Sequence, residues 1–107
     1  MKKIIGILGY EYQLDVTNTL EEMNGNVGYI DLDRGIIQIA SDAGFDMKVS
    51  TLLHEIMEAI NYHLEAGLTE QQIKIMEVGL YQTLTLSKVN LSALFLQEWT
   101  PAYTGAN

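Results

Sequence analysis

The residue types best suited to chemistry in this chain stand close together, at positions 54 to 58. His54 and Glu58 are four residues apart, a spacing that puts them about 40° apart on an α-helix and one turn from each other. Both side chains can therefore reach one point in space. Glu55 lies about 100° round the helix from His54 and can approach the same point from the side, as a base rather than a ligand. On this helix alone, an ordinary surface ion pair would show the same pattern.

A carboxylate in the next helical segment favours a functional interpretation. Apolar residues recur there at helical spacing, and Glu77 falls inside their stripe, about 40° from Ile73 and about 60° from Leu80. The expected buried stripe consists of Ile73, Met76, Leu80 and Leu84. A carboxylate buried without a partner is costly, so Glu77 requires a cation, a protonated histidine or a raised pKa.

Two partners for Glu77 follow if the helical segments lie side by side: a charged His54, or a metal ion that His54, Glu58 and Glu77 share. A divalent cation explains more of the pattern, because it also relieves the repulsion among Glu55, Glu58 and Glu77. The chain has no cysteine, so any metal must take histidine, carboxylate, carbonyl or water ligands. The sequence therefore predicts metal ligands at His54, Glu58 and Glu77, and a base at Glu55.

Two helices must hold these side chains in position. The first is expected over residues 47–66, with Asp46 or Ser50 as its cap and a stop at Gly67. Its expected core-facing residues are Leu53, Ile56, Met57, Ile60 and Leu64. Thr69-Glu70-Gln71-Gln72 has the spacing of a capping box, which predicts a second helix over residues 70–87. Because the linker is very short, the two helices are expected to be antiparallel neighbours.

Strands are expected before the helices. Residues 3–16 are rich in isoleucine, tyrosine and valine with partial alternation, and residues 28–32 and 36–40 form two runs around a turn signal. This order of elements predicts an α+β fold, in which a small antiparallel sheet of about three strands packs against the two helices. The pattern of residues 90–107 does not separate helix from strand.

Length and charge limit the classes of function. At 107 residues, 48% of them apolar, the chain is expected to form one domain, residues 1–107, that folds without a structural metal. Six basic and fourteen acidic residues give a net charge of −8, which opposes binding to nucleic acid or to an anionic membrane. The apolar start lacks a signal-peptide cleavage site, and no stretch approaches the roughly 20 apolar residues that span a bilayer. The cytoplasm is the expected location.

One stretch of the first expected helix resembles a known family. It reads Thr51-Leu52-Leu53-His54-Glu55-Ile56-Met57-Glu58-Ala59-Ile60 and is similar to the Thr-Leu-Leu-His-Glu-x-x-His-Ala-Ile helix of small phage and prophage zincin-like proteins, distant relatives of the ImmA/IrrE metallopeptidases. The resemblance extends from the expected hairpin through Leu84. It implies a minimal zincin-like fold, a phage origin with a location in the host cytoplasm, and a divalent metal, zinc ahead of manganese or magnesium.

The resemblance also implies roles for individual residues. His54 takes the place of the first metal ligand, and Glu55 that of the general base that activates a metal-bound water. Glu58 stands where the family has its second histidine, and Glu77 is expected as the third ligand. A carboxylate at position 58 makes bound water less acidic, which slows hydrolysis, and favours harder ions such as Mn²⁺ or Mg²⁺.

His63 is expected to have a packing role instead. It follows His54 by nine residues and therefore points to roughly the opposite side of the helix. Tyr62 and Tyr81 are expected to pack as well.

Three functions are compatible with these patterns. The first is a metal-dependent peptidase with the variant His-Glu-x-x-Glu site, acting on a peptide or protein substrate. The second is a catalytically inactive zincin-fold protein that binds or regulates a partner. The third is a structural or assembly subunit, a homodimer in which Leu94-Phe95-Leu96 and Trp99 mediate self-association.

Overall fold

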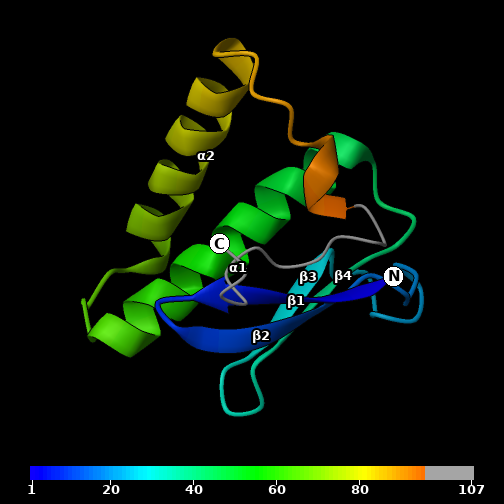
Figure 1. The fold of residues 1–107 in the computed structure, drawn as a ribbon, viewed down its shortest axis with the longest axis horizontal. Helices are drawn as coiled ribbons and strands as arrows, with labels where there is room; N and C mark the ends of the chain where they lie inside the picture. The colour runs from blue at the N-terminus through cyan, green and yellow to red at the C-terminus, as the bar shows by residue number, and fades with distance from the viewer. Residues whose placement is uncertain (96–107) are drawn as a thin grey trace, which may run out of the picture.

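A computed structural model of the chain describes residues 1–95, which form one sheet and two long helices (Figure 1). The helix α1 crosses one face of the sheet, and α2 folds back alongside α1. The elements, in chain order, are β1 (Lys2–Ile7), β2 (Tyr10–Asp15), β3 (Gly28–Asp31), β4 (Ile36–Ile39), α1 (Phe45–Leu64), α2 (Glu70–Leu86) and the 3-10 helix η1 (Ser92–Phe95). The predicted α+β class and the antiparallel helix pair are confirmed.

The single strand expected over residues 3–16 is in fact the hairpin of β1 and β2. The pairing runs from Ile7 opposite Tyr10 to Lys2 opposite Asp15, so the loop consists of Leu8 and Gly9 alone. Both loop residues have positive φ, 53° and 84°, the condition for a type I′ turn that matches the twist of the strands. Leucine seldom adopts this conformation, so the residue types at the turn did not mark it.

The sheet has four strands in the order β1-β2-β4-β3, and it is mixed. The expected hairpin over residues 28–40 is present as the antiparallel pair β3 and β4. The segment after β2 leads to β3, which forms the edge of the sheet. The chain then returns as β4, which lies between β2 and β3 and runs parallel to β2. The pairing is therefore not wholly antiparallel, because the connection before β3 is long enough to skip one strand position.

The core lies between the sheet and α1. Alternate residues of the inner strands point toward the helix and are fully buried, namely Tyr12, Leu14, Ile37 and Ile39. They meet Leu52 and Ala59 of α1. The prediction of the buried residues of this helix is wrong in part, because Leu64 is 62% exposed and Leu53 is only half-buried. Since α1 packs against the sheet on one side and α2 on another, the buried face is wider than one stripe.

On α2, the expected capping box is present, with reciprocal bonds between Thr69 and Gln72. Ile73 and Glu77 are buried as predicted, the carboxylate at 3% exposure. Met76 and Leu80, expected in the same buried stripe, are 45% and 41% exposed. The helix packs against α1 and has few contacts with the sheet. Its other side is left uncovered by the described residues.

The end of the described chain packs inward. Leu94 and Phe95 of η1 contact the core, and Phe95 lies edge-on to Phe45. These two residues are therefore partly covered within the chain, and Leu96 and Trp99, the other residues expected to mediate self-association, lie outside the described residues. None of the helices in residues 1–95 has the length and apolar character needed to cross a membrane.

Candidate metal centre

The contact between α1 and α2 contains several polar pairs beside the fully buried Ile73. At one end, Asn61 of α1 exchanges two hydrogen bonds with the backbone of Leu68, just before α2. In the middle, Ser50 and His54 contact Glu77. Two packed helices normally bury apolar ridges against each other, and here buried hydrogen bonds accompany the apolar contact. The polar side chains that the sequence singled out therefore meet between two rigid elements.

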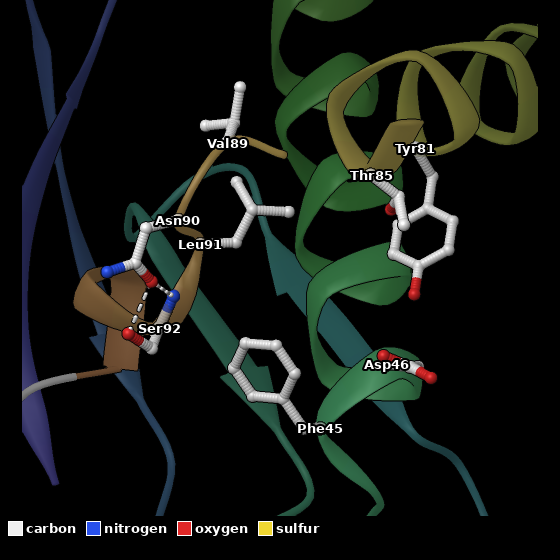
Figure 2. A pocket seen from close by; sticks show the side chains of 8 residues that line it. All are labelled: Phe45, Asp46, Tyr81, Thr85, Val89, Asn90, Leu91 and Ser92. Carbon is white, nitrogen blue, oxygen red and sulfur yellow. Dashed lines mark hydrogen bonds between the residues drawn. The ribbon is translucent and has the colours of Figure 1, made fainter. Parts of the chain in front are cut away.

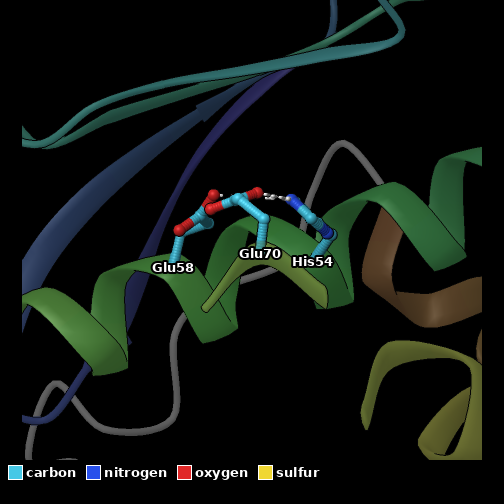
Figure 3. Close-up of side chains that lie close together, drawn as sticks. All are labelled: His54, Glu58 and Glu70. Carbon is cyan, nitrogen blue, oxygen red and sulfur yellow. Dashed lines mark ion pairs between the residues drawn. The ribbon is translucent and has the colours of Figure 1, made fainter. Parts of the chain in front are cut away.

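The two ring nitrogens of His54 have different partners. Nδ1 lies 3.0 Å from Oε1 of Glu77. Nε2 lies 3.5 Å from Oε2 of Glu58 and 3.7 Å from Oε1 of Glu70. Figure 3 shows Glu58 and Glu70 converging on this second nitrogen from α1 and from the start of α2. The imidazole thus separates a buried carboxylate from a pair of more accessible ones.

Glu77 is held as a buried, ionised acceptor. Burial raises the pKa of its carboxyl group, but hydrogen bonds from Ser50 and His54, together with Lys74 at 3.4 Å, outweigh burial and hold the pKa below its usual value. An ionised carboxylate can only accept, so the Nδ1–H of His54 must be the donor. This bond assigns a proton to Nδ1, so Nε2 is the ring nitrogen that faces Glu58 and Glu70 and would bind an ion there.

Glu58 and Glu70 lie close enough to share a proton. Burial and then a hydrogen bond with the Glu70 carboxyl group raise the pKa of Glu58. Two carboxylates in such a pair cannot both ionise without repelling each other. A divalent cation would take the place of the shared proton and relieve that repulsion.

The geometry of these three residues fits such an ion. One ligand atom each from His54, Glu58 and Glu70 lie within 4.8 Å of one another. Two ligands bound at about 2.0–2.2 Å with tetrahedral angles stand roughly 3.3–3.6 Å apart, close to the observed 3.5 and 3.7 Å from Nε2 to the two carboxylates. One imidazole and two carboxylates form a donor set that zinc and manganese both accept.

The structure brings the sequence-predicted residues together but divides their roles differently. Glu58 lies with Nε2 of His54, as expected of a ligand, whereas Glu77 occupies the Nδ1 side and does not converge on the same point. The third candidate ligand is Glu70, which sequence reasoning missed because an acidic residue in the first turn of a helix is commonplace. A signal was present: with a short linker between antiparallel helices, the start of α2 must face the later turns of α1.

Glu55 lies beside this cluster in a different environment. It is 7% exposed and is directed toward Gly28 on the edge strand β3. Burial, and to a lesser degree the neighbouring Glu58, Glu70 and Glu77, raises its pKa to about 7, against the opposing effect of His54. A buried carboxyl group with a pKa near neutrality can take up and release a proton at physiological pH, as a general base must.

The Glu55→Gln variant tests this environment through stability. The folded-state pKa of about 7 lies above the ordinary 4.5, so the protonated carboxyl group favours folding below pH 4.5, and this contribution is lost as the pH rises through 7. With chelator present, the variant should match the wild type near pH 4.5 and exceed its free energy of unfolding by roughly 3 kcal/mol above pH 8. Urea unfolding measured at both pH values checks this. Glu21→Gln, an exposed control, should not change the difference.

Gly28 is required by the close approach of β3 to α1. A methyl group at this position would overlap Cγ2 of Thr51 and lie 2.9 Å from Oε2 of Glu55. Gly28→Ala should therefore lower the free energy of unfolding by about 1–3 kcal/mol, as other overpacked sites do. Gly44→Ala is the matched control, because no atom of the described residues lies within 4 Å of its Cβ position. Equal losses in the two variants, measured by thermal unfolding, would contradict the close approach.

His63 has a packing role, as expected. Its ring stacks on Tyr10 at 3.9 Å between centroids, and its Nε2 lies 2.7 Å from the hydroxyl group of Tyr12. These contacts hold the end of α1 against β2. They also direct His63 away from His54, so it takes no part in the candidate metal centre.

A pocket of about 250 Å³ lies between the start of α1 and the end of α2 (Figure 2). Two of its polar residues, Asn90 and Ser92, are hydrogen-bonded to each other, and Asn90 accepts both bonds. The neighbouring Asp46 carboxylate raises the pKa of the Tyr81 phenol. The reactive residue types therefore gather at His54 and not in this pocket.

None of the protein-family models, curated proteins or solved structures with which the chain was compared matches it. The candidate site therefore stands on its own geometry.

Proposed function

We propose that the chain is a zincin-like metal-binding protein in which His54, Glu58 and Glu70 hold one divalent cation between α1 and α2. The observation that carries the proposal is the arrangement around His54. Glu77 accepts from Nδ1 while two carboxylates face Nε2. Carboxylate–histidine pairs of this kind orient metal-binding imidazoles and make them better donors.

Zinc is the ion we propose first. The two carboxylates balance its charge, and the separations at Nε2 suit a tetrahedral site. Mn²⁺ and Mg²⁺ are the alternatives, because carboxylate oxygens favour harder ions.

We further propose that the site hydrolyses peptide bonds, with Glu55 as its base. A bound cation would supply Lewis acidity, which polarises a substrate carbonyl group and makes a coordinated water more acidic. Glu55 would accept the proton of the attacking water and then pass it to the leaving amine. Burial against Gly28 keeps bulk water from its carboxyl group, and the raised pKa suits it to both transfers. Glu77, which itself accepts a hydrogen bond from Ser50, would hold the imidazole in position from the Nδ1 side.

The resemblance of residues 51–60 to the helix of phage and prophage zincin-like proteins supports this assignment. We therefore propose a phage origin, action in the host cytoplasm and a peptide or protein substrate. Glu58 in place of the family's second histidine is consistent with slow turnover, because two anionic ligands reduce the acidity of coordinated water.

A second candidate function is metal-dependent binding of a protein partner without catalysis. The small exposure of Glu55, 7%, favours it, since a base must reach water and substrate. In this case the bound ion would link α1 to α2 and stabilise their arrangement.

Both candidate functions require a bound metal ion. Elemental analysis after dialysis against zinc and removal of free ion tests this requirement. The wild-type chain should retain one zinc per molecule, and His54→Ala should retain none. His63→Ala is the matched control, because it removes the same side chain from the same helix outside the centre. A wild-type chain that retains no zinc, manganese or magnesium would refute the proposal.

A further inference from the structure

The candidate ligand Glu70 stands directly after the link between the two long helices. This link consists of residues 65–69, between the end of α1 at Leu64 and the start of α2 (Figure 1). The chain reverses its direction there through two residues with left-handed backbone conformation, Glu65 and Gly67, whose φ angles are 49° and 69°. Most of the link is exposed, so burial contributes little to its position, and hydrogen bonds must hold it instead.

One residue of α1, Asn61, makes hydrogen bonds to both halves of the link. Its backbone carbonyl group accepts from the N–H of Ala66 at 3.1 Å. Its side chain makes two bonds with the backbone of Leu68: Oδ1 accepts from the N–H at 2.9 Å, and Nδ2 donates to the carbonyl oxygen at 3.2 Å. An amide side chain has both donors and an acceptor, so it can satisfy a backbone N–H and a backbone carbonyl group at once. We call the two bonds to Leu68 the Asn61 clamp.

Glu70 lies between the Asn61 clamp and the first buried residue of α2. Leu68 precedes it by two residues, and Ile73, which is fully buried, follows it by three. The side chain of Glu70 is itself 73% exposed, so packing does not hold it at 3.7 Å from Nε2 of His54 (Figure 3). Helix ends fray unless their backbone is tied down. The clamp therefore keeps the first turn of α2, and Glu70 with it, beside α1.

The capping box of α2 does not replace the clamp. Its two hydrogen bonds join Thr69 to Gln72, so they stabilise the first turn as a helix but do not attach that turn to α1. The bonds of Asn61 to Leu68 make this attachment. A helix can begin correctly at Thr69 and still place Glu70 too far from His54 to share an ion with it.

We propose that Asn61 is a positioning residue of the candidate metal centre, which does not bind the ion but holds Glu70 where it can bind. This role rests on the proposed metal site and extends it to a residue outside the ligand set. Residues that orient metal ligands typically contribute about 10- to 100-fold to metal affinity. Holding Glu70 beside α1 before the ion arrives reduces the conformational freedom that binding would otherwise remove.

Zinc binding by the full chain, measured by competition with a chelator of known affinity, tests the role of Asn61. Asn61→Ala removes the clamp without changing a ligand and should raise the dissociation constant for zinc about tenfold or more. Val16→Ala is the matched control, because it lowers stability at a buried position just after β2, outside the contact between α1 and α2. It should leave the dissociation constant unchanged. Circular dichroism should show that both variants fold.

A double-mutant cycle separates positioning of Glu70 from a general loosening of the fold. If Asn61 acts through Glu70, Asn61→Ala should have no further effect on a chain that already carries Glu70→Gln. On a chain that carries Glu58→Gln it should keep its roughly tenfold effect, because Glu58 belongs to α1 and does not depend on the clamp. Equal losses of zinc affinity on the two backgrounds would overturn the inference.

Hydrogen exchange of the chelated protein gives a readout that needs no metal. The amide of Leu68, which donates to Asn61 in the wild type, should exchange several-fold faster in Asn61→Ala because its hydrogen bond is lost. Unchanged exchange there, or an Asn61→Ala chain that binds zinc as tightly as the wild type, overturns the inference and leaves the proposed function standing. A wild type that binds no zinc, manganese or magnesium refutes the proposed function, and this inference with it.

Discussion

Zinc should raise the melting temperature of the chain by roughly 10–20 °C at a free concentration about 100 times its dissociation constant. The ion binds the folded state, where one atom each of His54, Glu58 and Glu70 lie within 4.8 Å, and the unfolded chain does not hold these atoms together. The effect is large because a chain of 107 residues has a small entropy of unfolding, so each kcal/mol of binding moves the transition by several degrees. Calorimetry of the chelated protein with added zinc measures it.

Variants separate the ligands from the residue that positions them. His54→Ala should abolish the zinc-induced shift, and Glu70→Gln should remove most of it. Glu77→Gln should keep part of it, because losing the carboxylate behind a ligating histidine weakens metal binding about 10- to 100-fold without removing a ligand.

Glu21→Gln, which removes one exposed charge far from the site, should retain the full shift. The opposite order, with Glu77→Gln abolishing the shift and Glu70→Gln preserving it, would contradict the geometric assignment. The ligand set expected from the sequence would then be the correct one.

Glu55→Gln should lower the rate of peptide hydrolysis by about 10²- to 10⁴-fold, the usual contribution of a general base. Glutamine has nearly the same shape as glutamic acid but cannot accept a proton, and it suits the buried position beside Gly28. The zinc-induced rise in melting temperature should persist, because Glu55 is not among the clustered ligand atoms. A set of unstructured fluorogenic peptides, assayed with zinc and again with chelator, provides the measurement.

Outcomes of this assay distinguish the two candidate functions. Hydrolysis that chelator stops and Glu55→Gln removes supports the peptidase. Hydrolysis unaffected by Glu55→Gln shows that the proposed mechanism is wrong. A wild type that binds zinc and hydrolyses nothing supports the binding protein.

Much of the fold could be predicted from local patterns. The capping box at Thr69 marked the start of α2 correctly, because its reciprocal hydrogen bonds form within four residues. The α1 helix and the β3–β4 hairpin were also predicted from periodicity and turn residues. The β1–β2 turn was missed because it depends on two positive φ angles, one of them at a leucine, that pairing of the strands imposes.

Which apolar residues would be buried could not be predicted in full. Met76 and Leu80 belong to an apolar pattern, yet both are exposed. Periodicity shows that a helix has an apolar side but does not show what that side meets. On α2, the buried carboxylate of Glu77 needs hydrogen-bond partners, and it finds them in Ser50 and His54 of α1. These contacts help to determine which side of α2 faces α1.

The candidate site could likewise be predicted only in part. Residues close in sequence were sufficient to place His54, Glu55 and Glu58 on one helix and to identify Glu77 as a carboxylate facing inward, because helical geometry is regular over a few turns. The assignment of Glu77 to Nδ1 and of Glu70 to Nε2 required the packing of α2 against α1. A shift of less than one helical turn between two helices changes which carboxylate faces which nitrogen, and side-chain contacts between them, not the pattern within either, determine that shift.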